Sequence, residues 1–128
     1  MTPAGAPDRL PTPQVIQGYG NGGFTVSGLR HEGAAIVLRT HTSSWSPPDD
    51  LSRLTISDFA AVTQPSADVE IVLLGCGQRA VMLSGELRAA LRAAGITVES
   101  MDTGAACRTF NLLQMEGRRV AAMLVAMP

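Results

Sequence analysis

The sequence has 128 residues, of which 45% are hydrophobic and 16% are charged. This length and composition are typical of one globular domain and exclude an intrinsically disordered chain. The formal net charge of −1 lacks the basic excess of a nucleic-acid-binding surface, and the longest apolar run, residues 120–127, is too short to form a transmembrane segment.

The first 13 residues contain four prolines and little that a core would bury. We therefore expect a flexible tail there, followed by a single domain over residues 14–128. The same stretch lacks the basic and apolar regions of a secretory signal. Because no export signal accompanies the two cysteines, we expect free thiols and a cytoplasmic location.

The next segment is rich in residues that favour β-structure. Residues 14–18 form a short candidate strand, and residues 19–23 form a glycine-rich turn. Two further runs, 24–29 and 35–41, lie on either side of a break at 31–33. This spacing predicts an N-terminal antiparallel β-hairpin. A homodimer that forms through the exposed hairpin edge is a further alternative, since free strand edges pair readily with other strands.

A loop and a short helix follow. Residues 43–50 include two adjacent prolines, which cannot donate to a central strand, and the only tryptophan, Trp45. Trp45 is either an interaction hot spot, because aromatic anchors dominate protein interfaces, or a cover over one end of the core. Residues 55–62 predict a short helix capped by Thr55 or Ser57.

The second half alternates between strands and helices. Ser84 is the expected cap of the first of these helices, and Gly95 its end. The expected strands are 69–74, 96–101 and 119–127, and the expected helices are 85–94 and 103–115. This order predicts an α/β fold with a parallel βαβαβ core in a mixed sheet, an N-terminal antiparallel β-hairpin, and helices packed on the sheet.

A candidate site follows from this topology, because ligands of parallel sheets gather at the carboxyl ends of the strands. The turn at 75–79 and the start of the 103–115 helix share that edge, and helix N-terminal amides favour anions. The candidate ligand-binding or anion-binding residues are Gly75, Gly77, Arg79, Thr103, Gly104, Cys107, Arg108 and Asn111. The alternative is that the small residues permit close packing of helix and sheet.

Cys107 has two interpretations. Its place near a helix N-terminus beside Arg108 favours a thiolate, as a nucleophile requires. Free cysteines are also among the most buried residues, which favours a packing role. No feature places His31 or His41 near Cys107, and the two cysteines and two histidines lack metal-ligand spacing. We therefore assign no catalytic residue, no metal site and no cofactor.

Thr103, Cys107 and Asn111 repeat at intervals of four residues and lie on one face of the helix. Such a stripe is either a cleft wall or a hydrogen-bonding seam that ties the helix to adjacent loops. Asp102, directly before the helix, either fixes the strand-to-helix turn by accepting amide hydrogen bonds or lies beside a ligand.

Three motifs carry a family resemblance: residues 73–77 (Leu-Leu-Gly-Cys-Gly), 101–111 (Met-Asp-Thr-Gly-Ala-Ala-Cys-Arg-Thr-Phe-Asn) and 116–120 (Glu-Gly-Arg-Arg-Val). With them, the chain resembles a small α/β family that includes the mitochondrial respiratory complex I assembly factor 3 and many short bacterial proteins. The likeness covers about residues 14–126 and is most specific in 69–120. Cys76 departs from the pattern, which more often has threonine between the two glycines.

The resemblance implies a function that depends on protein contacts. Eukaryotic members assist the assembly of a respiratory complex, and the family offers no catalytic residues to carry over. We therefore expect a non-enzymatic accessory or assembly module with a protein partner, acting in respiratory or membrane-complex biogenesis. The alternative is a small-molecule-binding or anion-binding protein, or a thiol-dependent enzyme, that uses the helix N-terminus near Cys107.

Overall fold

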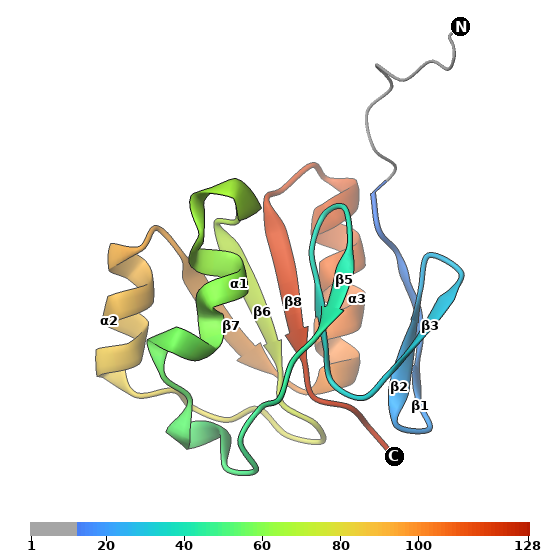
Figure 1. Ribbon diagram of the computed structural model, residues 1–128, viewed down its shortest axis with the longest axis horizontal. Helices are drawn as coiled ribbons and strands as arrows, with labels where there is room; N and C mark the ends of the chain where they lie inside the picture. Colours follow the sequence, from blue (N-terminus) through green and yellow to red (C-terminus); the bar gives the residue numbers. More distant parts are fainter. Residues whose placement is uncertain (1–12) are drawn as a thin grey trace, which may run out of the picture.

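The computed structural model describes residues 13–128, which form a single α/β domain with two sheets (Figure 1). The tail expected at residues 1–13 lies outside the described residues, apart from Pro13. The α/β class, the parallel core and the antiparallel N-terminal strands are confirmed.

The first sheet has three antiparallel strands in the order β1-β2-β3. They are β1 (Ile16–Gly20), β2 (Gly23–Val26) and β3 (Leu29–Glu32). Two-residue turns join them, and all four turn residues (Asn21, Gly22, Ser27 and Gly28) have positive φ, between 48° and 85°. Such turns match the twist of a hairpin.

The second sheet has five strands in the order β5-β4-β8-β6-β7. They are β4 (Ala35–Val37), β5 (Thr42–Ser44), β6 (Ile71–Gly75), β7 (Thr97–Met101) and β8 (Val120–Leu124). β6 pairs in parallel with both β7 and β8, whereas β4 is antiparallel to β5 and β8.

The predicted position of the hairpin was wrong in detail. The runs 24–29 and 35–41 do not pair with each other, because each contains a turn of its own. In the run 24–29, Ser27 and Gly28 form the turn between β2 and β3. In the run 35–41, the amide of Leu38 donates to the carbonyl of His41 across a turn, at 2.9 Å. The break at 31–33 instead marks the passage from one sheet to the other, where Gly33 has a φ of 82°.

The helices lie close to their predicted positions. Two longer helices are α2 (Gly85–Ala93) and α3 (Thr103–Met115), and α1 (Ala60–Thr63) extends the 3-10 turn η2 (Ile56–Phe59). Shorter 3-10 turns are η1 (Leu51–Arg53) and η3 (Pro65–Ala67). Ser84 caps α2 as expected, since its hydroxyl accepts from the amide of Leu87 at 3.1 Å.

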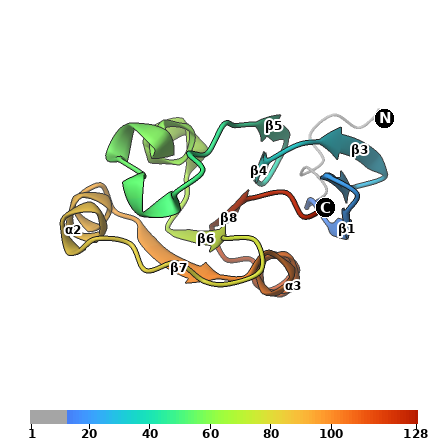
Figure 2. The same ribbon diagram turned by 90° about the horizontal axis from the view of Figure 1, so that it is seen from below.

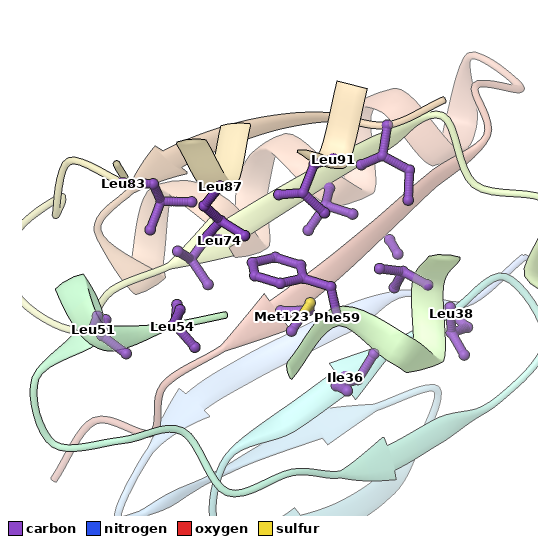
Figure 3. Close-up of a cluster of buried hydrophobic side chains, with 14 residues drawn as sticks. Ile36, Leu38, Leu51, Leu54, Phe59, Leu74, Leu83, Leu87, Leu91 and Met123 are labelled. Carbon is purple, nitrogen blue, oxygen red and sulfur yellow. The ribbon is translucent and has the colours of Figure 1, made fainter. Parts of the chain in front are cut away.

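Two apolar cores cover the two faces of the five-stranded sheet. On one face, Leu74 and Met123 of the sheet pack against Phe59 and against Leu87 and Leu91 of α2 (Figure 3). On the other, Leu73 and Leu124 pack with Phe110 of α3 and with buried residues of the first sheet. Figure 2 shows α3 on the opposite side of this sheet from α1 and α2. Because alternate residues of a strand point to opposite faces, β6 needs an almost unbroken apolar run.

Candidate functional site

The carboxyl ends of β6 and β7 meet the start of α3, as the sequence predicts. The amide of Cys76 donates to the carbonyl of Met101 at 2.8 Å, and the amide of Thr103 donates to the carbonyl of Gly77 at 2.8 Å. These bonds bring residues 75–77 and 102–104 side by side at one edge of the sheet.

The Thr103 hydroxyl joins three segments of the chain. It accepts from the amide of Gly77 at 2.9 Å and donates to the carbonyl of Val125 at 2.8 Å. Thr103 is completely buried, so water cannot replace either bond. The hydroxyl therefore ties the end of β6, the start of α3 and the chain beyond β8 together.

Asp102 caps α3. Its Oδ1 accepts from the amide of Ala105 at 2.8 Å, which confirms the turn-fixing interpretation. A carboxylate at this position also meets the positive end of the helix dipole. The Asp102 carboxylate thus already occupies part of the site that an external anion would use at this end of α3.

The small residues at this edge permit close packing. A Cβ on Gly75 would lie 2.9 Å from Leu124 Cδ2 and 3.1 Å from Thr103 Cα. A Cβ on Gly104 would meet the phenol of Tyr19 and lie 3.3 Å from the Arg108 guanidinium. The packing alternative therefore accounts for both glycines.

Tyr19 belongs to this edge although the sequence assigned it to a turn. A bulge in β1 between Ile16 and Gly18 shifts the register against β2. Because of this extra residue, Ile16 and Tyr19 both share a strand face with buried residues of β2, toward α3. No local signal in the sequence marks such a bulge.

Cys107 packs in the second core and is almost fully buried. Burial raises the pKa of its thiol to about 12; the charge of Arg108 acts against this rise and that of Asp102 adds to it. No hydrogen bond joins Cys107 to His31 or His41. This environment disfavours a thiolate, which a nucleophilic cysteine needs.

Asn111 holds β1 against α3. Its Oδ1 accepts from the amide of Ile16 at 2.8 Å, and its Nδ2 donates to the carbonyl of the same residue at 2.9 Å. The side-chain amide thus takes the place of a neighbouring strand. Together with the bonds of Thr103, this pair confirms that the polar stripe on α3 is a hydrogen-bonding seam.

The two arginines of the candidate site are exposed. Arg79 lies in the connection between β6 and α2, and Arg108 lies on α3 beside Gly104. Neither forms an ion pair with another residue in 13–128. Anion binding at this edge therefore stays a prediction that depends on these two side chains.

Trp45 covers one end of the first core. Its indole Nε1 donates to the carbonyl of Leu124 at 3.1 Å, and the half-buried ring packs against the core beneath α1 and α2. This placement favours the covering role, and the exposed part of the ring leaves an interaction role as a prediction.

A family profile described as a protein of unknown function (DUF498/DUF598) matches residues 16–125. The chain belongs to this family. An uncharacterised protein of Rhodobacter capsulatus, a relative of the chain, is 35% identical over 113 residues, which are 88% of this chain and 85% of that protein.

Another DUF498/DUF598 relative carries a functional name. Human NADH dehydrogenase (ubiquinone) 1 alpha subcomplex assembly factor 3 is 34% identical over 113 residues. The match covers 88% of this chain but only 61% of the human protein. The chain is therefore similar to less than two thirds of that assembly factor.

A solved structure supports the fold of this DUF498/DUF598 chain. It is described as an outer membrane protein from Bartonella henselae, and it superposes with a TM-score of 0.80 at 35% identity. The match covers 94% of this chain and all of the Bartonella chain. Within residues 13–128, no helix has the length and apolar character to cross a membrane.

Residues 13–128 contain no group of three or more histidine, cysteine, aspartate or glutamate side chains arranged to hold a metal ion. The two cysteines are free thiols; Cys107 is buried and Cys76 is half-buried.

Proposed function

We propose that this chain is a non-enzymatic accessory module that acts through protein contacts in the assembly of a respiratory or other membrane complex. The observation that carries the proposal is the 34% identity to the human assembly factor over 88% of this chain. The geometry of the candidate edge agrees with it, because Thr103, Asn111 and Asp102 use their polar atoms within the fold.

The thiol-dependent alternative has less support. Burial raises the pKa of Cys107 to about 12, so the thiol is protonated near neutral pH. If Cys107 nevertheless reacts with a thiol reagent at pH 7 as fast as a free cysteine, and Cys107→Ser abolishes function in cells, the enzyme alternative replaces the accessory role.

The compartment is part of the proposal. Two free thiols favour the reducing cytoplasm, whereas the similar Bartonella chain is described as an outer membrane protein. Cell fractionation of a tagged chain distinguishes these locations. We expect the chain in the cytoplasmic fraction, in part attached to the inner face of the membrane through its partner.

The decisive experiment is deletion of the gene in its own organism, followed by native electrophoresis of membrane complexes. We expect a smaller amount of one assembled complex and a build-up of a subassembly. A tagged wild-type chain should restore assembly and co-purify with subunits of that complex. Unchanged assembly, together with no recovered complex subunit, would contradict the proposal.

A further inference from the structure

We propose that the free edge of β7 docks an extended segment of a partner protein, which adds to the five-stranded sheet as a further strand. This inference rests on the proposed function, because it names the surface and the chemistry of the protein contact. The occupant has acidic and apolar side chains on one face and a basic side chain on the other.

β7 is the outermost strand of its sheet (Figure 2). The amide of Thr97 donates to the carbonyl of Glu70 at 2.9 Å, and the carbonyl of Met101 accepts from Cys76. Because backbone groups alternate along a parallel strand, those of Val98 and Ser100 point away from β6. Within residues 13–128, they form no hydrogen bond.

A groove lies beside these free groups. Val81, Met82 and Leu83 from the connection before α2 line a hollow of about 360 Å³ together with Val98 and Ser100. A second hollow of about 130 Å³ extends it toward the start of β7. Met82 is 83% exposed. An added strand would find its backbone partners on β7 and apolar contacts for its side chains in this groove.

The charged side chains around the groove indicate which charges the docked segment carries. Arg88 and Arg92 lie one turn apart on α2, line the hollows, and form no ion pair with another residue in 13–128. Glu99 also lines both hollows from β7, but it pairs with Leu73, whose side chain belongs to the α3 side of the sheet, so its carboxylate is directed to the face away from α2. The matching strand therefore directs acidic residues toward α2 and a basic residue toward Glu99.

A second copy of the chain fits this edge poorly. An antiparallel pair of β7 strands that engages Val98 and Ser100 of both copies would place the two Glu99 side chains directly opposite each other. Like charges in that position are destabilising. A different protein with the complementary charges has no such penalty.

The other three sheet edges are less open to an added strand. On β1, the side-chain amide of Asn111 already bonds to both backbone groups of Ile16. On β3, Arg30 pairs with Glu32 at 2.9 Å, and its guanidinium also donates to the carbonyls of Gly20 and Asn21. Charged side chains of this kind protect an edge. β5 has only three residues, whereas β7 has five.

A synthetic heptapeptide, Val-Thr-Glu-Lys-Val-Thr-Glu, tests the proposal by amide NMR. We expect it to shift the amide resonances of Val98 and Ser100 at millimolar concentration. The charge-reversed peptide Val-Thr-Lys-Glu-Val-Thr-Lys should bind about fivefold more weakly, because its charges oppose those of the groove. No shift, equal affinity of both peptides, or shifts confined to β1, β3 or β5 would overturn the proposal.

Two proline variants provide a matched pair. Ser100→Pro removes one outward amide of β7 and keeps the bonds to β6, so it should abolish peptide binding. Ser44→Pro makes the same change on β5, where the amide of Trp45, the next residue, bonds inward to Ala34; this variant should bind the peptide normally. Binding by Ser100→Pro as strong as by the wild type would overturn the proposal.

A charge variant covers the case in which Ser100→Pro fails to fold. Arg88→Glu combined with Arg92→Glu changes only exposed side chains of α2 and should weaken the first peptide about fivefold. An unchanged affinity would contradict the assigned charges. Self-association of the wild type that Ser100→Pro abolishes would identify a second copy as the occupant instead.

The cellular assay separates this inference from the proposed function. If Ser100→Pro is folded and still recovers complex subunits as the wild type does, β7 is not the contact, and the accessory role stands. If the wild type recovers none and its deletion leaves assembly unchanged, the accessory role itself fails.

Discussion

At the scale of single residues, the Thr103 hydroxyl holds the segments of the candidate edge together through two buried hydrogen bonds. Thr103→Val keeps the shape of the side chain but leaves the Gly77 amide and the Val125 carbonyl without this partner. Since unpaired buried polar groups are costly, we expect a loss of about 2–4 kcal/mol in the free energy of unfolding. Urea unfolding at 25 °C measures it.

Thr103→Ser is the matched control. It retains both hydrogen bonds and removes only a buried methyl group, so we expect a loss of about 1 kcal/mol. Equal losses for the two variants would mean that packing of the methyl group, and not the hydroxyl, matters at this position.

Cys107 gives the chain a pH dependence in the alkaline range. Burial raises the pKa of the folded thiol from 9.0 to about 12. Above pH 9 the unfolded chain therefore loses this proton while the folded chain keeps it. The contribution of the Cys107 thiol to the free energy of unfolding thus falls between pH 9 and about 12. We expect Cys107→Ala, although less stable at pH 7, to lose less stability over this range.

Denaturant unfolding at a series of pH values checks this prediction. Comparison with Cys107→Ala isolates the contribution of this thiol, because all other ionisable groups are common to the two proteins. Parallel curves for the two proteins above pH 9 would show that the thiol is more accessible than its burial indicates.

At the scale of elements, the close approach of α3 to β6 depends on Gly75. An alanine there would bring its Cβ within 3.1 Å of the Thr103 backbone, so α3 would have to move away from the strand. We expect Gly75→Ala to destabilise the fold by about 1–3 kcal/mol, as overpacking does. The midpoint of urea unfolding reports the change.

Gly85→Ala is the control for Gly75→Ala. Gly85 opens α2, and a Cβ there meets no atom within 4 Å. Alanine favours helix over glycine, so this variant should be neutral or more stable by up to about 1 kcal/mol. A comparable destabilisation by both variants would contradict the steric explanation.

Elements with strong local signals could be predicted from the sequence. The bounds of α3 were correct because an Asp-Thr-Gly step begins it and a Glu-Gly step ends it. The first hairpin was misplaced because Ser27 and Gly28 interrupt an otherwise alternating run, and serine is a weaker turn signal than asparagine. The role of Tyr19 was missed because a bulge depends on pairing with β2.

The chemistry of the candidate site was harder to predict than its location. The sequence places Cys107 near a helix N-terminus and beside an arginine, and both features favour a thiolate. Its burial against the first sheet and β8 reverses this effect. Residues from distant parts of the chain provide that burial, so no local pattern contains it.

At the scale of the whole molecule, the two sheets should differ in stability against local opening. β8 is buried along its whole length and lies between β4 and β6, whereas β3 is a mostly exposed edge strand. We expect amides of β8 and β6 to exchange with solvent only through global unfolding, and the edge amides of β3 to exchange much faster. Amide exchange measured by NMR tests this order.

Uniform protection across both sheets would contradict that expectation and would mean that the domain opens as one unit. Variation of denaturant concentration provides the control. The exchange of β8 amides should then follow the global unfolding free energy, while that of β3 amides should be almost independent of denaturant.

The central place of β8 also has a consequence for synthesis on the ribosome. β4 is made early, β6 later and β8 last of the three, yet β8 is the strand that joins the other two. Until residues 120–124 have emerged, the nascent chain has two partial sheets and no closed core. Its apolar strands therefore remain uncovered until β8 is made, and we expect the unfinished domain to bind chaperones that hold nascent chains.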